Sequence, residues 1–485
     1  MQSRKVQDIG LIFFLAVLTY SPSLTADFTF DDRPAILENN DVTEDVTVSN
    51  FTDYLRRISR HDFWGANITD HSTSHKSYRP LTVLSFKLDH FIQKVFRQAS
   101  KQDGTVSPTF FHANNILLHA LNSILFYAFI DKNINLFIPT NNPDNRKSSQ
   151  SVDSSRTFCF ISAVIFAIHP VHTESIAGIV GRADLLYSWF VMLALLIHHH
   201  ISSPFIGIVA GIIANLSVLS KEQGIILLPL IIIHRILRKI SSKKSRTKTE
   251  LLIYFVKQKS IFVYAFTLLL ILYGRFWIMD FRAPTFQEGD NPIAFISGPF
   301  LRFLNYSYIY WINLWILLSP NWLCFDWSMG CLNYIRQLDL NSTFQTQTMH
   351  KLLMVISFWS FITILSLRAL VDMYNPKQSK TLKVFSNGNK SATNSVAVFL
   401  ALTLLTLPFI PASNMFFTVG FVIAERNLYL SVGGFALLIA IGYQKISKYL
   451  QSNKKISRAY FVSISKFCML FLIAVFICKS LVRSY

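Results

Sequence analysis

The chain has 485 residues, of which 51% are hydrophobic, 14% aromatic and only 15% charged. Soluble domains carry about a quarter charged residues, so this composition, with a mean hydropathy of +0.37, excludes a soluble protein with one sizeable core. The net charge of +19 lies mostly in short linkers between apolar runs, which indicates membrane orientation and not binding to nucleic acid. We expect an all-α polytopic membrane protein.

Apolar runs long enough to cross a bilayer recur along the chain. The first follows Arg4 and Lys5, and the sequence Thr19-Tyr20-Ser21-Pro22 after it is a poor signal-peptidase site, so we expect a retained helix. The stretch 296–320 is rich in aromatic and amide side chains, which favours an interfacial helix. The eleven predicted crossings are 9–25, 110–130, 157–172, 183–200, 204–219, 223–238, 260–279, 350–368, 396–412, 428–444 and 460–478.

The basic linkers predict the orientation of these crossings. Eleven crossings place all of the basic linkers on the cytoplasmic side. The opposite, lumenal side then receives a first long loop, 26–109, a second one, 280–349, and three short turns. The basic segments are the tip at Arg4 and Lys5 and the linkers around 146–156, 235–259, 377–383 and 445–455, and the lumenal glycosylation sequons begin at Asn50, Asn67 and Asn341. A fourth sequon, at Asn389, falls on the cytoplasmic side.

The stretch FTFDDRPAI, residues 28–36, comes directly after the first predicted span and places Asp31 and Asp32 at the membrane surface. A plain turn is one interpretation, because Asp is a common turn residue and Pro34 can open a short helix. The stretch SYRPLT adds Arg79 to the same loop.

The stretch HPVHTESIAGIVGRADLL, residues 169–186, places Glu174, Arg182 and Asp184 between two predicted spans. Ionisable groups near apolar spans are costly, so they face a cavity or one another. A structural pair between Arg182 and either acid is the alternative to a functional role. His169 and His172 have no compelling third ligand, so we expect no metal site.

Two further lumenal turns carry charges. In SKEQGI, Ser220 and Gln223 match a capping box, which leaves Lys221 and Glu222 unexplained. A lysine at the positive end of a helix suits a phosphate. In VIAERNLYL, Glu425 and Arg426 precede an apolar helix, where an interfacial anchor is the alternative.

Acids and bases thus share one predicted rim of the membrane domain. A site for an anionic lipid headgroup needs this mixture, because cations hold the phosphate and a carboxylate handles a proton. The acids are Asp31, Asp32, Glu174, Asp184, Glu222 and Glu425, and the bases are Arg79, Arg182, Lys221 and Arg426.

Six stretches, in this order between about residues 8 and 445, resemble the transmembrane and tetratricopeptide-repeat-containing O-mannosyltransferases. The resemblance implies a single GT-C glycosyltransferase domain over 1–485 in the endoplasmic reticulum membrane. It implies dolichyl-phosphate mannose as the donor and Ser or Thr hydroxyls of secretory-pathway proteins, cadherin domains among them, as acceptors. The stretches are FTFDDRPAILENNDV, SYRPLTVLSF, HPVHTESIAGIVGRADLL, SKEQGI, INLWILLSPNWLCFDWSMG and PASNMFFTVGFVIAERNLYL.

By analogy with GT-C enzymes, Asp31 and Asp32 are the expected catalytic residues of an inverting transfer. The expected ligands of the donor phosphate are Arg79, Arg182, Lys221 and Arg426, with Glu174, Asp184, Glu222 and Glu425 in support. The lipid-linked donor is a substrate, so no cofactor is expected, and the expected partners are protein acceptors and other proteins of the endoplasmic reticulum.

The resemblance leaves two matters open. Family members carry tetratricopeptide repeats after the last span, and we find none here, so the chain is either partial or a form without repeats. A non-catalytic scaffold of the same family is one alternative function. A lipid or solute transporter is another, although charges at one rim and a long first loop disfavour transport.

Overall fold

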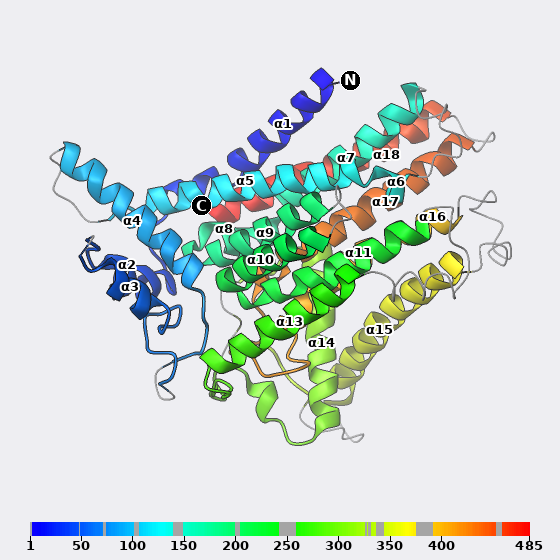
Figure 1. Ribbon diagram of the computed structural model, residues 1–485. Coiled ribbons are helices and arrows are strands. Elements are labelled where there is room, and N and C mark those ends of the chain that lie inside the picture. The colour runs from blue at the N-terminus through cyan, green and yellow to red at the C-terminus, as the bar shows by residue number, and fades with distance from the viewer. Residues whose placement is uncertain are drawn as a thin grey trace.

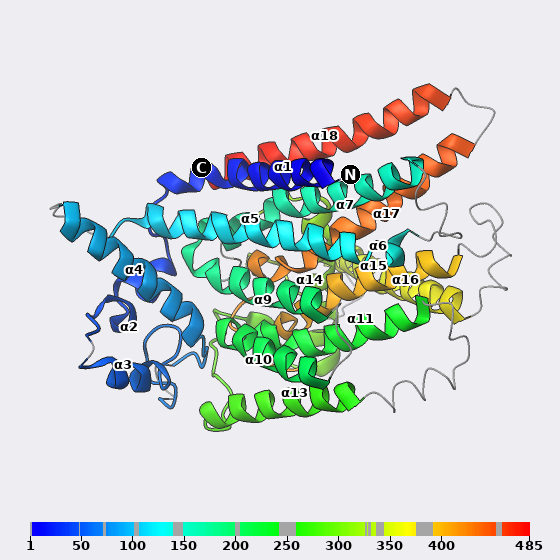
Figure 2. The same ribbon diagram turned by 45° about the horizontal axis from the view of Figure 1, so that its top comes forward.

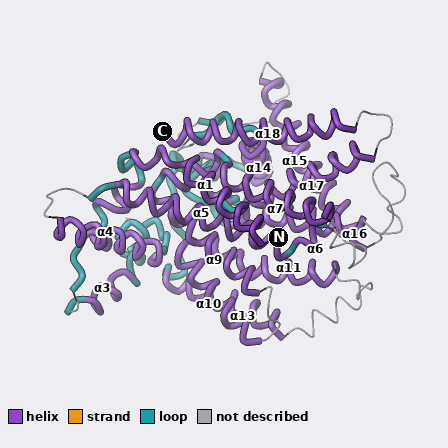
Figure 3. Tube along the Cα trace, turned by 90° about the horizontal axis from the view of Figure 1, so that it is seen from above, coloured by secondary structure: helices purple, strands orange, loops and turns teal. Residues whose placement is uncertain are grey.

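The computed structural model describes residues 2–47, 49–70, 74–100, 106–138, 149–198, 204–241, 259–324, 327, 331–335, 344–374, 391–452 and 458–485. Within these ranges the protein consists of helices and loops, and a single isolated bridge joins His61 to Asn67. The predicted all-α membrane fold is confirmed. Figure 3 shows the helices with the loops gathered at the end of the bundle where α3, α4 and the C-terminus lie.

Every predicted crossing overlaps a helix of the structure. The helices that do so are α1 (Gln2–Tyr20), α5 (Pro108–Lys132), α7 (Ser149–Ile168), α9 (Arg182–His198), α10 (Pro204–Ser220), α11 (Leu227–Ser241), α13 (Lys259–Ile278), α15 (Phe344–Tyr374), α16 (Ser391–Thr406), α17 (Ser431–Ser452) and α18 (Arg458–Ser484). Figure 1 shows most of them running side by side.

Fewer helices than the eleven predicted crossings are both long enough and apolar enough to span a membrane. Within the described ranges, seven are long and apolar enough to cross a membrane, or eight if the bent pair Asp153–Ile168 and Pro170–Ala177 is one span. Among the remaining predicted crossings, α10 and α11 have only 17 and 15 residues, and α17 becomes polar in its second half, with Gln444, Lys445 and Lys448.

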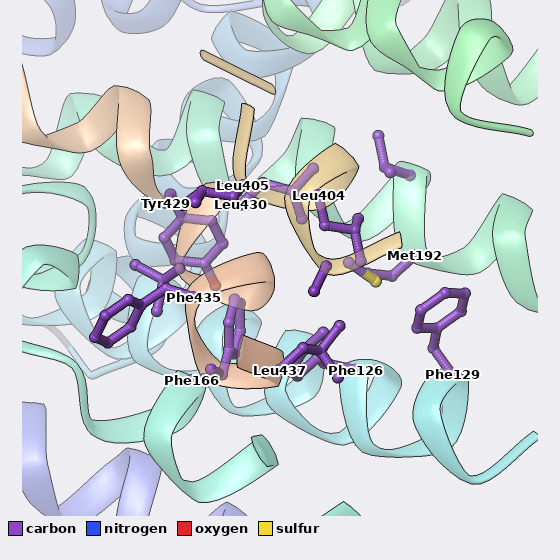
Figure 4. Packing of buried hydrophobic residues seen from close by; sticks show 14 of the residues in the cluster. Phe126, Phe129, Phe166, Met192, Leu404, Leu405, Tyr429, Leu430, Phe435 and Leu437 are labelled. Atoms are coloured by element: carbon purple, nitrogen blue, oxygen red, sulfur yellow. The ribbon is translucent and has the colours of Figure 1, made fainter. Parts of the chain in front are cut away.

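The core of the bundle lies between α5, α7, α9, α16 and α17. Figure 4 shows its aromatic part, where Phe126, Phe166, Tyr429 and Phe435 pack together. The helices α16 and α17 approach very closely at Gly434, because a Cβ atom there would lie 2.2 Å from the backbone nitrogen of Leu405.

Ion pairs fix one end of the bundle. The Lys5 ammonium lies 2.6 Å from Asp131 at the end of α5, and Arg156 of α7 lies 2.7 Å from Asp8 of α1. In Figure 2 the ends of α11, α13, α15, α16, α17 and α18 that flank the predicted basic linkers also lie at this side, opposite α2–α4 and the C-terminus. Most residues of those linkers lie outside the described ranges. The arrangement agrees with the prediction that they share one side.

The first loop forms a small helical unit. Lumenal helices were expected beside the crossings, but the sequence did not place these. It contains η2 (Arg33–Leu37), α2 (Asn40–Thr43), α3 (Phe51–Ile58) and α4 (Pro80–Ser100). These elements pack around Phe63 and Phe86, together with Phe111 of α5. The loop therefore has its own core, attached to the end of the bundle.

The second loop contains η7 (Pro292–Phe295) and α14 (Pro299–Leu318), which is inclined to the other helices in Figure 1. Trp359 of α15 donates a hydrogen bond to Ser307 of α14 at 3.0 Å, so this helix packs against α15. Its interfacial position stays a prediction. The short elements that connect the remaining helices are η1 (Ser21–Thr25), α6 (Ile134–Phe137), η4 (Pro170–His172), α8 (Thr173–Ala177), η5 (Ile179–Gly181), η6 (Glu222–Ile226), η10 (Leu407–Ala412) and η11 (Glu425–Leu428).

Candidate functional site

The two adjacent aspartates lie on a turn between η1 and η2. The Asp32 backbone N–H donates to the Thr29 carbonyl at 2.8 Å. Phe30, which precedes the two aspartates, has a φ of 42°, a left-handed conformation that is strained for an aromatic residue and that recurs at functional sites. The turn interpretation is therefore correct for the backbone, and the role of each carboxylate depends on its surroundings.

Asp32 is buried, with 1% of its surface exposed. Its Oδ1 accepts from the Val180 backbone at 2.9 Å, and its Oδ2 accepts from the Thr29 backbone at 3.3 Å. Burial raises the pKa of Asp32 to about 6, although these backbone hydrogen bonds oppose the shift. Asp32 thus joins the first turn to η5, the segment that leads into α9.

Asp31 is more accessible and faces a cation. Its side chain is 26% exposed, and its Oδ2 accepts from Nη1 of Arg426 at 3.3 Å. Glu174 of α8 also binds Arg426: its Oε2 accepts from the Arg426 backbone N–H at 2.9 Å and its Oε1 lies 3.5 Å from Nε. The structure therefore brings Asp31, Glu174 and Arg426 together, and Arg426 is no simple interfacial anchor.

Lys221 lies beside this group, at the turn between α10 and η6. Its ammonium donates to Asp184 at 2.6 Å and to Oδ1 of Asn427 at 3.0 Å. Burial lowers the pKa of Lys221 to about 8, against the opposing effect of Asp184. Lys221 as a whole is 5% exposed, and its ammonium already has two partners. Its contact with a phosphate stays a prediction.

The predicted capping box at Ser220 and Gln223 is wrong. The Ser220 hydroxyl donates to the Leu216 carbonyl at 2.9 Å, and the Gln223 amide donates to Pro408 at 3.4 Å. A 3-10 turn, η6, follows Lys221, and α11 starts only at Leu227, so neither side chain can cap that helix.

Glu222 binds two arginines at once. Arg79 lies 2.9 Å from its Oε2, and Arg275 of α13 lies 2.8 Å from its Oε1. Burial alone would raise the pKa of Glu222, but the two guanidinium groups outweigh it and the pKa is lowered. Sequence reasoning missed Arg275, although an arginine inside a predicted span is itself a signal of function.

Arg182 has a different partner from those expected. Its Nη1 forms an ion pair with Asp89 of α4, Nε donates to Asn115 at 2.8 Å, and Nη2 donates to the Phe111 carbonyl at 3.0 Å. The alternatives of a pair with Asp184 or Glu174 are therefore wrong. With 1% of its surface exposed, Arg182 joins α9 to the first loop, and its assignment to the donor phosphate stays a prediction.

Glu425 connects the site to the last helix and the second loop. It lies 2.9 Å from Nη2 of Arg483 in α18, and its Oε1 accepts from the Cys324 backbone at 2.7 Å. Burial raises the pKa of Glu425 to about 8 despite Arg483. Glu425 therefore fixes η11, the element that carries Arg426.

Within the described ranges, no group of three or more His, Cys, Asp or Glu side chains is arranged to hold a metal ion. The fold and the site together define a multi-pass membrane protein with a cluster of paired acids and bases at one end of its helix bundle.

Comparison with known proteins bears on the resemblance. A sequence profile for "Protein O-mannosyl-transferase TMTC, DUF1736" matches residues 280–363, most of which belong to the second loop. This profile and the relatives described next confirm the resemblance to the TMTC family.

Three relatives illustrate the match. Protein O-mannosyl-transferase TMTC4 of Mus musculus is 32% identical over 475 residues, which cover 92% of this chain and 57% of the relative. The TMTC3 and TMTC2 enzymes of Homo sapiens are each 32% identical, over 92% and 90% of this chain and 43% and 52% of their own lengths. The chain thus spans about half the length of the curated relatives it matches. No solved structure matches.

Proposed function

We propose that the protein transfers mannose from dolichyl-phosphate mannose to Ser or Thr hydroxyls of secretory-pathway proteins, cadherin-like domains among them, at the lumenal face of the endoplasmic reticulum. The observation that carries the proposal is the partly exposed Asp31 carboxylate beside the Arg426 guanidinium. The names of the relatives, protein O-mannosyl-transferases, support it. The proposal treats residues 1–485 as one GT-C-type domain with lumenal loops at 26–109 and 280–349.

The proposed reaction is a single displacement. The acceptor oxygen attacks the anomeric carbon of mannose, and Asp31 takes the hydroxyl proton. The bond from that carbon to the phosphate oxygen breaks, its electron pair leaves with dolichyl phosphate, and the configuration inverts. A general base of this kind contributes on the order of 10²–10⁴ in rate.

Asp31 is the better base of the two aspartates because an acceptor can reach it. Asp32 is buried and its oxygens already accept backbone hydrogen bonds. Arg426 lies next to Asp31 and can stabilise the negative charge on the leaving phosphate, an effect of about 3 kcal/mol for a well-placed donor. Glu174 also keeps Arg426 in place, through its backbone N–H and its Nε.

The test compares Asp31→Asn with Asp32→Asn in the full chain. Asparagine keeps the size of the side chain but cannot take the proton, so Asp31→Asn should lose roughly 10²-fold or more of mannose transfer. Asp32→Asn should lose less. The assay measures transfer from labelled dolichyl-phosphate mannose to a Ser/Thr acceptor domain in a preparation shown to be active.

Donor binding, measured separately, should persist in both variants. Full activity of Asp31→Asn would exclude Asp31 as the base, and full activity of both variants would leave the pair with a structural role only.

A further inference from the structure

A groove opens between α10 and α13 on the outside of the helix bundle. Its volume of about 440 Å³ lies in the range of pockets that hold small ligands. Apolar side chains line most of it, and Ile208, Ile212 and Leu270 are each more than half exposed. Because α13 belongs to a candidate membrane span of which only 11% is buried, the groove opens towards lipid.

Glycines set the shape of this groove. The two helices touch at Gly211, where a Cβ atom would lie 3.0 Å from Thr267 of α13. At Gly274, further along α13, no heavy atom lies within 4 Å of the position that a Cβ atom would take. The helices are therefore in contact at one end of the groove and leave open space beside Gly274, next to Arg275.

The end of the groove at Arg275 is cationic. Arg275 and Arg79 share the single carboxylate of Glu222, so the three groups together carry one uncompensated positive charge. The two arginine side chains are 14% and 21% exposed, and three N–H contacts of Arg275 go to Glu222 and to the backbone carbonyls of Lys76 and Tyr78. A guanidinium has five N–H donors, so donors are left for an anion.

This cationic end leads directly to the proposed catalytic residues. Glu222 is the neighbour of Lys221, which contacts Asn427 at 3.0 Å. Asn427 follows Arg426, which pairs with Asp31. A ligand that occupies the groove with its anionic end at Arg275 thus lies next to the site.

We infer that the groove binds the isoprenoid chain of the lipid-linked donor, and that its phosphate lies between Arg275 and Arg79 at the end of the groove and Arg426, which stabilises the leaving charge. The inference rests on the proposed function for the identity of the donor. An apolar groove suits a hydrocarbon chain, and one net positive charge complements the single negative charge of a phosphodiester. Neither Arg275 nor the groove has a role in the site predicted from the sequence.

The first test fills the groove. Gly274→Leu places a side chain in the open space beside Arg275, and Gly10→Leu is the matched control, because Gly10 is also a helical glycine in a candidate span with no heavy atom within 4 Å. The full chain in nanodiscs is labelled with a polyprenyl phosphate that carries a diazirine on its chain. Gly274→Leu should lower labelling roughly tenfold, and Gly10→Leu should not.

Chain length separates the groove from the phosphate site. Competition with methyl phosphate should be unaffected by Gly274→Leu, because methyl phosphate has no hydrocarbon chain to lie beside Gly274. Arg275→Gln should weaken competition by long and short phosphates alike, roughly tenfold. Arg79 still pairs with Glu222 in that variant, which keeps the loop attached.

The peptides of the protein that carry the label show where the polyprenyl phosphate binds, and this measurement needs no acceptor protein. Labelling of α10 and α13 supports the inference even if mannose transfer fails, so the two proposals fail separately. Labelling spread over the outer helices, equal in Gly274→Leu and wild type, would overturn it and leave the groove occupied by bulk lipid only.

Discussion

The fold buries the carboxyl group of Asp32, so a negative charge on this group lowers the free energy of unfolding. Its pKa is about 6 in the folded protein against a reference value of 3.8, so between these two values the folded state binds the proton more tightly than the unfolded state. Protonation of Asp32 therefore stabilises the folded state. This contribution to the free energy of unfolding is fully present below about pH 4 and is lost as the pH rises through about 6.

Asp32→Asn should remove this pH dependence. An asparagine has no charge to bury, so the variant should gain thermal stability relative to wild type more at about pH 7 than at about pH 4.5. The measurement is the thermal midpoint of the detergent-solubilised protein at both pH values. An equal difference between variant and wild type at both values would show that the Asp32 carboxylate is not the cause.

At the residue scale, the sequence indicates which charged residues lie close together better than it indicates their partners. Asp31, Glu174 and Arg426 meet as one group, and Lys221 lies beside them. The partners Asp89, Asn427 and Arg275 were missed. Arg182 and Asp89 are 93 residues apart and Lys221 and Asn427 are 206 apart, so these contacts depend on how distant helices pack, which no local pattern contains.

At the element scale, the apolar runs predict the bundle helices because length and hydrophobicity decide what crosses a bilayer. The same reasoning misses α4. This helix mixes apolar residues that face the loop core, such as Phe86, with exposed ones such as Phe91, and Lys87 and Asp89 lie between them. No continuous apolar run results, so the helix that holds the partner of Arg182 leaves no clear signal.

The contact between α16 and α17 provides a prediction for these elements. Gly434→Ala puts a methyl group 2.2 Å from a backbone atom of α16, and backbone cannot move as a flexible side chain does. Overpacking of this kind costs about 1–3 kcal/mol, so the thermal midpoint should fall by several degrees. Gly442→Ala on the same helix meets nothing within 4 Å and should keep or raise the midpoint. Equal midpoints for the two variants would contradict the close packing.

At the scale of the whole molecule, the sidedness of the bundle is testable through glycosylation. The Asn67 sequon is exposed, and its Oδ1 accepts from the Thr69 hydroxyl at 2.9 Å. It lies in the first loop with the proposed site, so we expect its modification in microsomes. A sequon engineered into 241–248, in the strongest basic linker, should remain unmodified. Modification of that engineered sequon, read as a glycosidase-sensitive gel shift, would reverse the orientation.

The pairing of Asp31 with Arg426 also fixes the earliest time at which the proposed site can form. The two residues are 395 positions apart in the chain, and a ribosome adds about 5–20 residues each second. Asp31 is therefore made roughly 20 to 80 s before Arg426, while the helices between them are inserted one after another. During that interval the nascent chain carries an incomplete centre, so chains that stop before η11 can hold the first turn but cannot assemble the pair.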